Sequence, residues 1–223
     1  MERDARVAAV AALAEPTRRR LYQHVARSPN PLSRDDVAGA TGVPRPTAAF
    51  HLDRLVAEGL LDVHYERRSG RTGPGAGRPA KLYRRAEGTV DVSLPERHYD
   101  LAGDLLAGAL SESSEAGGSP REVLDRRAYE RGRELASGAA RGRAAVLGVL
   151  ETHGFEPREE GAVISLVNCP FHALAQAHTE LVCGMNLRLL AGMLDAVEAG
   201  LAARLAPAPG RCCVVLEPVA ATG

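Results

Sequence analysis

The chain's most chemically informative residues are four cysteines in its last third. They are Cys169, Cys183 and the adjacent pair Cys212 and Cys213. The segment MERDARVAAV at the start is charged, and no long apolar run could serve as a signal peptide or a membrane span. We therefore expect a cytoplasmic protein. In a reducing compartment, clustered cysteines favour metal, iron–sulfur or redox chemistry over structural disulfides.

The spacing of the cysteines narrows the kind of site. Thirteen residues separate Cys169 from Cys183, and twenty-eight separate Cys183 from Cys212. Ordinary zinc fingers and ribbons pair their ligands about two to four residues apart, so this spacing argues against them. It also argues against the cysteine runs of ferredoxins.

Apolar patterns predict the elements that carry these cysteines. AAVLGVLETHGFEP is typical of a helix, GAVISLVNCP of a strand, HTELVCGMNLRLLAGMLDAVEAGL of a long amphipathic helix and CCVVLEP of a final strand. This βαβ-like order puts the cysteines at the end of one strand, near the start of the helix and at the start of the last strand. Functional residues concentrate at such element ends, so we expect the cysteines to converge.

Charge divides the chain into two parts of opposite sign. The composition, 45% hydrophobic and 25% charged, is ordinary for a globular protein of one or two domains. Residues 1–90 hold 16 Lys and Arg against 10 Asp and Glu, whereas residues 91–223 hold 12 against 18. Phosphate contacts dominate affinity for nucleic acids, so the net +6 of the first part suits a DNA-binding domain, and charge alone is equally consistent with a solvated face.

Residues 1–90 follow the pattern of a winged helix-turn-helix domain. Two helical patterns come first, the earlier with Val7, Val10, Ala11 and Ala14 at helical spacing. Ser33 and Asp36 then form a capping box for a third helix, which stops at Gly42, and a fourth runs from about Pro44 to Glu58. LLDVHY and KLYRR predict a hairpin, or wing, whose long basic tip suits a phosphate backbone or a minor groove and carries Arg67, Arg68, Arg71 and Arg78.

The segments ALAEPTRRRLYQHV, TGVPRPTAAFHLDRLVAEGLL and GRPAKLY resemble the winged-helix regulators of the ArsR type and their relatives. The resemblance covers about the first 85 residues. It implies that the second helix of the pair lies in the major groove with its early residues toward base edges, which nominates Arg45, Pro46, Thr47, His51 and Arg54. Where that family has small polar or basic residues, this chain has Ala49 and Phe50, so base readout there is apolar or absent, or Phe50 belongs to the core.

The sequence of residues 91–145 predicts helices that connect the two domains or pair two subunits. Leucines recur at helical spacing from Leu101 to Leu110, and REVLDRRAYERGRELA carries opposite charges four residues apart, such as Glu122 with Arg126. Two recognition helices must be set about one helical turn apart to read a two-fold operator, so we expect these helices to form a homodimer. The alternative is that they pack only against their own C-terminal domain.

The segments NCPFH, LVCGMN and GRCC resemble the SufR-like regulators, winged-helix repressors of iron–sulfur assembly genes whose C-terminal cysteines hold an iron–sulfur cluster. With these segments the resemblance runs over nearly the whole chain. It implies Cys169 and Cys183 as ligands, together with one of Cys212 and Cys213, of which the spacing favours Cys212.

A four-iron cluster needs a fourth ligand. The candidates are Cys213, His172, His178, a carboxylate or a small thiol from solution. His172 follows Cys169 by three residues, and His178 precedes Cys183 by five. Adjacent cysteines point to opposite faces of a strand, so two in a row fit one cluster awkwardly, and Cys213 is equally consistent with a buried core residue.

These patterns predict an α+β protein with a winged helix-turn-helix domain at 1–90, a helical dimerisation spacer at 91–145 and a small α/β sensor domain at 146–223. We expect a repressor whose affinity for double-stranded DNA depends on a 4Fe-4S cluster that senses iron, oxidative or nitrosative state. A zinc site or a thiol switch in place of the cluster is the first alternative. A cysteine-dependent enzyme is the second, but no Cys/His/Asp motif or phosphate-binding glycine loop supports it, so we expect no enzyme.

Overall fold

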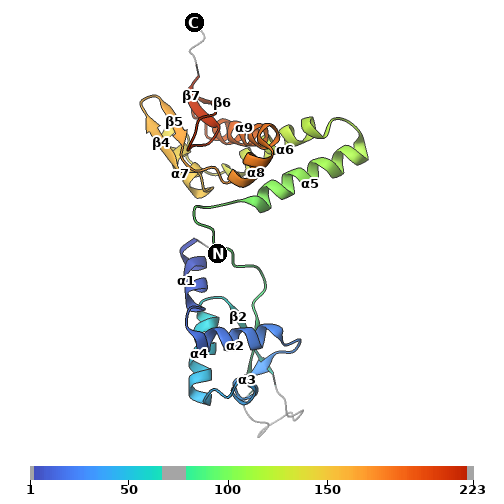
Figure 1. Ribbon diagram of the computed structural model, residues 1–223, viewed down its shortest axis with the longest axis vertical. Helices are drawn as coiled ribbons and strands as arrows, with labels where there is room; N and C mark the ends of the chain where they lie inside the picture. Colours follow the sequence, from blue (N-terminus) through green and yellow to red (C-terminus); the bar gives the residue numbers. More distant parts are fainter. Residues whose placement is uncertain (1–2, 67–78, 220–223) are drawn as a thin grey trace. The chain divides into compact units, whose positions relative to one another are not determined.

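The chain folds into two compact units, Met1–Val92 and Ser93–Gly223, in the computed structural model (Figure 1). The structure describes residues 3–66 and 79–219. Helices and a small antiparallel sheet make up each unit, so the expected α+β class is confirmed. None of the helices within these ranges is both long enough and apolar enough to span a membrane.

The first unit contains the elements of a winged helix-turn-helix domain. Their bounds are α1 Arg3–Ala12, α2 Pro16–Arg27, β1 Leu32–Ser33, α3 Arg34–Thr41, α4 Arg45–Ala57, β2 Leu61–Glu66 and β3 Ala80–Arg85. The strands form a sheet in the order β1-β3-β2, with antiparallel neighbours and Val63 of β2 opposite Tyr83 of β3. Strands β2 and β3 are the two arms of the hairpin that the sequence predicts.

The turn between α3 and α4 forms for local reasons. The Ser33 hydroxyl accepts a hydrogen bond from the Asp36 N–H at 3.2 Å, and the Asp36 carboxylate accepts one from the Ser33 N–H at 2.9 Å. This is the predicted capping box, and it starts α3. Gly42 ends α3 with a φ of 69°, a left-handed conformation that glycine adopts without a steric cost. Helix α4 then begins at Arg45.

The core of the first unit lies between its helices and the sheet. Leu21, Leu52 and Leu55 are fully buried there. Ala9 and Ala12 of helix α1 are buried, whereas Val7 and Val10 are 43% and 48% exposed. The periodicity of the valines therefore marks the outer face of α1. Alanine occurs on every side of this helix, so hydrophobicity alone does not fix which stripe is buried, and the smaller side chains allow the closer approach.

The second unit is a bundle of helices against a four-stranded sheet (Figure 1). The bounds are α5 Tyr99–Ala116, α6 Pro120–Leu135, α7 Arg143–Thr152, β4 Pro157–Glu160, β5 Val163–Leu166, α8 His172–Ala177, α9 Thr179–Ala196, β6 Leu201–Leu205 and β7 Val214–Pro218. The strand order is β4-β5-β7-β6, and all neighbours are antiparallel.

The antiparallel sheet corrects the βαβ-like order that the sequence suggests. Ile164 of β5 lies opposite Leu216 of β7 in an antiparallel pair. The reason is β6, which follows α9 and pairs with β7 from Leu201 opposite Pro218 to Leu205 opposite Val214. This extra strand reverses the direction of the chain before β7 begins.

Helices α6 and α9 approach each other closely through two glycines. A Cβ added to Gly132 of α6 would lie 2.0 Å from the Leu189 carbonyl oxygen, and one added to Gly192 of α9 would lie 2.0 Å from the Tyr129 carbonyl oxygen. Each helix therefore presents a glycine to the backbone of the other. This contact fixes the position of α9, the helix that carries Cys183.

Helix α5 packs on α6, and both helices belong to the second unit. The side of α5 that faces the core includes Leu105, which is 2% exposed, whereas Leu110 is 60% exposed. The leucine pattern is thus divided between the unit's own core and its surface. Arg126, which follows Glu122 by four residues, forms ion pairs with Glu112 of α5 and with Glu130.

Candidate DNA-binding face and cysteine site

Helix α4 presents one polar face to solvent. Arg45, Pro46, Thr47 and Arg54 are all exposed on it, while Ala48, Leu52 and Leu55 point into the core. Phe50 is 66% exposed and lies on the same outer side, so it is not a core residue. Four of the five residues nominated for base contact are therefore on the accessible side of the helix.

His51 is the exception, because it is buried and does not lie on the accessible face of α4. It is only 9% exposed, the Arg18 Nε donates to its Nδ1 at 3.4 Å, and its Nε2 lies 3.7 Å from the Glu15 carboxylate. Glu15 itself caps α2 by accepting hydrogen bonds from the N–H groups of Arg18 and Thr17, and the bond from Arg18 holds its pKa below the usual value. His51 therefore links α4 to the start of α2. Its spacing with the buried positions 48, 52 and 55 is the signal that could have shown this.

Two arginines of the exposed face have acidic partners. The Nε of Arg45 lies 2.6 Å from the Asp35 carboxylate of α3, and Nη2 of Arg54 lies 2.5 Å from the Glu58 carboxylate one turn later. Each of these guanidinium groups therefore lies beside a carboxylate at the surface.

Hydrogen bonds to Asp53 join α4 to β3, one arm of the wing. The Asp53 carboxylate accepts hydrogen bonds from Lys81 Nζ at 2.5 Å and from the Tyr83 hydroxyl at 2.8 Å. Burial acts to raise the pKa of Asp53, but the bonds from Lys81 and Tyr83 outweigh it and keep that pKa below its usual value. Burial and the same carboxylate raise the pKa of Tyr83. The wing arginines Arg67, Arg68, Arg71 and Arg78 lie outside the residues that the structure describes.

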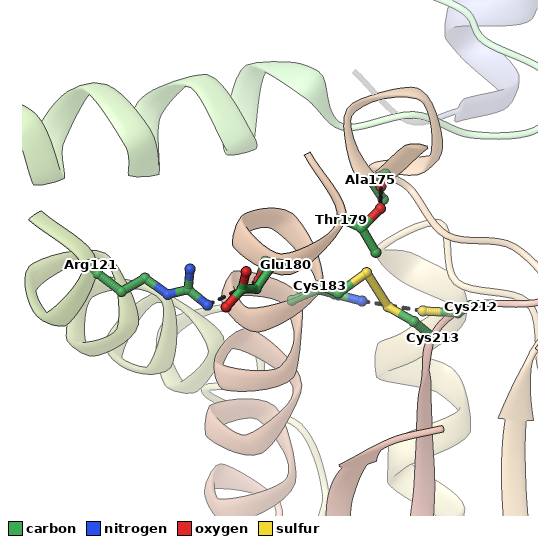
Figure 2. The surroundings of a disulfide bond; sticks show 8 residues. Arg121, Ala175, Thr179, Glu180, Cys183, Cys212 and Cys213 are labelled. Carbon is green, nitrogen blue, oxygen red and sulfur yellow. Dashed lines mark hydrogen bonds between the residues drawn. A yellow bond between two sulfur atoms is a disulfide. The ribbon is translucent and has the colours of Figure 1, made fainter. Parts of the chain in front are cut away.

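The four cysteines meet in the second unit as two pairs. Cys183 of α9 and Cys213, just before β7, are joined by a disulfide with their Cα atoms 6.5 Å apart (Figure 2). Cys169, in the segment after β5, shares a side-chain hydrogen bond with Cys212. The adjacent cysteines thus turn their sulfur atoms to different partners. The segments that carry the cysteines thus lie together in the structure, as their places at element ends predict.

Backbone hydrogen bonds hold the adjacent cysteines in place. The Cys212 N–H donates to the Leu166 carbonyl of β5 at 2.8 Å, and the Cys213 carbonyl accepts from the Ala206 N–H at 2.7 Å. These bonds fix the two cysteines between β5 and the end of β6. Cys212 is 1% exposed, and Cys213 is partly exposed.

The surroundings of Cys169 and Cys212 make the two thiols unequal. The hydrogen bond from Cys212 lowers the pKa of Cys169 although burial acts the other way, and the same bond together with burial raises the pKa of Cys212. Asn186 of α9, 1% exposed, donates from Nδ2 to the Cys212 sulfur at 3.3 Å. Arg97 adds positive charge near Cys169 and donates to its carbonyl at 3.4 Å. Cys169 is the thiol of this pair that ionises first.

The disulfide differs from the thiols that the sequence led us to expect at Cys183 and Cys213. A Cα separation of 6.5 Å lies within the range that disulfides span, so the fold itself permits the bond. In residues 3–66 and 79–219, no three His, Cys, Asp or Glu side chains are arranged to hold a metal ion. His172 begins α8 and His178 precedes α9, and both are exposed to solvent.

Comparison with known families bears on the first unit. Residues 13–64 match the model of a helix-turn-helix domain family, a range that includes α2, α3 and α4 and reaches into β2. No curated protein matches the chain. The fold and this match define a helix-turn-helix DNA-binding domain. Such a domain indicates a DNA-binding transcription regulator rather than an enzyme.

Proposed function

We propose that this protein is a transcription regulator whose affinity for its DNA operator follows the state of the four-cysteine site. The observation that carries the proposal is the meeting of Cys169, Cys183, Cys212 and Cys213, from three separate segments, in a unit joined to a DNA-binding domain. A site that ties the end of β5, the start of α9 and the start of β7 together changes the unit whenever its bonds change.

The reduced site holds an iron–sulfur cluster in this proposal. Cys169, Cys183 and Cys212 are the ligands, and the fourth is Cys213, His172 or His178. The donor chemistry fits, because soft thiolates are the ligands that such clusters require. The cluster would supply a group that oxidants, nitric oxide or iron shortage can alter. Reduction of the Cys183–Cys213 disulfide must come first, since a disulfide sulfur is not a thiolate ligand.

A thiol switch without a cluster is the second candidate. The disulfide favours it, and so does the neighbouring Cys169–Cys212 thiol pair, in which one thiol has a lowered pKa. Here the disulfide and dithiol forms of the protein are the two states. Zinc held by the reduced cysteines belongs to the same alternative.

The proposal includes a homodimeric repressor that binds a two-fold operator. Exposed Leu110 on α5 and exposed Val7 and Val10 on α1 are apolar side chains available to a second copy. A coupling of about 2 kcal/mol between the cysteine site and the DNA-binding domains would shift operator affinity roughly thirtyfold. That shift is large enough to control a gene.

Purification without air tests the proposal. We expect a brown protein that contains iron and sulfide, and whose DNA affinity changes when the cluster is removed by oxidation. A colourless protein that binds zinc or nothing, and whose DNA affinity changes between dithiothreitol and oxidant, favours the second candidate. An operator affinity that is the same in all these states would refute both.

A further inference from the structure

An acidic side chain lies against the first residue of the recognition helix. Asp35, the second residue of α3, places a carboxylate oxygen 2.6 Å from the Nε of Arg45. The side chains are 55% and 58% exposed, so this pair is on the surface and is not a part of the core. Exposed ion pairs contribute little to stability, so the contact with Arg45 adds little to the favourable place of an acidic side chain in the first turn of α3.

A carboxylate on this surface is unfavourable for DNA binding. It faces the phosphate backbone of any duplex that α4 approaches, and like charges repel. Asp53, the acidic residue on the side of α4 that meets the wing, is compensated by Lys81 and Tyr83. Asp35 has Arg45 at 2.6 Å and Arg34 at 3.8 Å. Its closer contact is with the residue best placed to read a base.

The closest contact between Asp35 and Arg45 is made by Nε and not by either Nη group. Asp35 engages Nε, on the side of the guanidinium group. Within residues 3–66 and 79–219, the closest acidic contact of the Arg45 guanidinium is therefore made by Nε, with Asp35. The two Nη groups form the end of the guanidinium that can donate side by side to O6 and N7 of guanine. Arg54 differs, because its Nη2 is taken by Glu58 at 2.5 Å.

We propose that Asp35 is a specificity-determining positioning residue, which holds Arg45 through Nε so that its Nη groups meet a guanine end-on. The inference rests on the proposed DNA-binding function and deepens it by naming the base class that the helix reads. A guanidinium already fixed by one partner loses less conformational freedom when it binds a base. Without Asp35, Arg45 turns to the nearest phosphate, a contact that carries no sequence information.

Two effects of opposite sign follow from removing Asp35. Affinity for a duplex of unrelated sequence rises, because one negative charge leaves the binding face. The preference for the cognate duplex over that unrelated duplex falls, because the oriented arginine is lost. A residue that only stabilised the start of α3 would lower both affinities together.

The test uses the full-length protein and two fluorescent duplexes. One is the duplex that the wild-type protein selects from a randomised pool, and the other is its scrambled sequence. We expect Asp35→Ala to lower the ratio of the two affinities about tenfold and to raise affinity for the scrambled duplex a fewfold. Asp62→Ala is the matched control, since it removes one exposed acidic charge from the same unit beside Arg84 instead of Arg45. Its ratio should equal that of the wild type.

A double-mutant cycle separates positioning from charge. In an Arg45→Ala background, Asp35→Ala should cause no further fall in the ratio. An unchanged ratio in Asp35→Ala, or an equal fall with and without Arg45, would overturn the inference while leaving DNA binding intact. A wild-type protein that shows no preference between the duplexes refutes the proposed function together with it. Asp35→Ser repeats each measurement with a side chain that can still cap the first turn of α3, should the alanine variant unfold.

Discussion

The Cys183–Cys213 disulfide predicts a redox-dependent stability of the second unit. The bond closes a loop of 30 residues, and the loss of chain entropy in the unfolded state corresponds to about 3.5 kcal/mol at 25 °C. The free energy of unfolding of the second unit should therefore be greater by about that amount in the oxidised protein than in the reduced protein. The measured quantity is this difference, because it cancels the packing effect of each substitution.

The cysteine variants make the prediction specific. Urea unfolding, followed by circular dichroism, should give the full difference for Cys169→Ser and Cys212→Ser and none for Cys183→Ser and Cys213→Ser. Counting free thiols beforehand confirms that the oxidised wild type, Cys169→Ser and Cys212→Ser each contain one disulfide, and that oxidised Cys183→Ser and Cys213→Ser contain none. A difference that survives in Cys213→Ser, or vanishes in Cys212→Ser, would refute the pairing on which the reasoning depends.

Four further predictions concern DNA, colour, packing and assembly. Arg45→Ala should weaken operator binding by about 1 to 3 kcal/mol and relax base preference, whereas Arg71→Ala should weaken all sequences alike and reduce the salt dependence by about one unit, both measured by fluorescence anisotropy. Replacing Cys169, Cys183 or Cys212 by serine should abolish the visible absorption of protein purified without air, and Cys213→Ser shows whether Cys213 is the fourth ligand; a full spectrum in all four variants would contradict the cluster. Gly192→Ala should destabilise the second unit by about 1 to 3 kcal/mol in urea, because its Cβ meets the Tyr129 carbonyl at 2.0 Å, whereas Gly148→Ala, with no atom within 4 Å, should not. Light scattering should give the mass of a dimer, and a monomer at micromolar concentration would count against the two-fold operator.

The DNA-binding domain could be predicted because its signals are local. The capping box of Ser33 and Asp36 and the left-handed Gly42 act within a few residues, and the structure has both. The family pattern places His51 on the DNA face, whereas the helical spacing of positions 48, 51, 52 and 55 places it with the buried residues. Burial of a polar residue at such a position depends on partners far along the chain, here Glu15 and Arg18.

The second unit was harder to predict because its strands are short and its pairing is remote. Strand β4 carries exposed charges and no alternating pattern, and β6 follows α9 so closely that LAARL extends the helical pattern. The convergence of the cysteines could be predicted from their places at element ends. Which sulfur pairs with which could not, because the pairing is set by the antiparallel position of β7 between β5 and β6.

Cys212 and Cys213 are consecutive residues, yet each serves a different pair. Their Cα atoms are separated by one peptide unit, about 3.8 Å, which does not stretch. A displacement of the Cys213 backbone therefore also displaces Cys212, and with it the thiol that lies beside Cys169. The backbones of the two cysteines therefore move together. The partly exposed Cys213, which is bonded to Cys183, is in this way joined by one peptide unit to a cysteine that is 1% exposed.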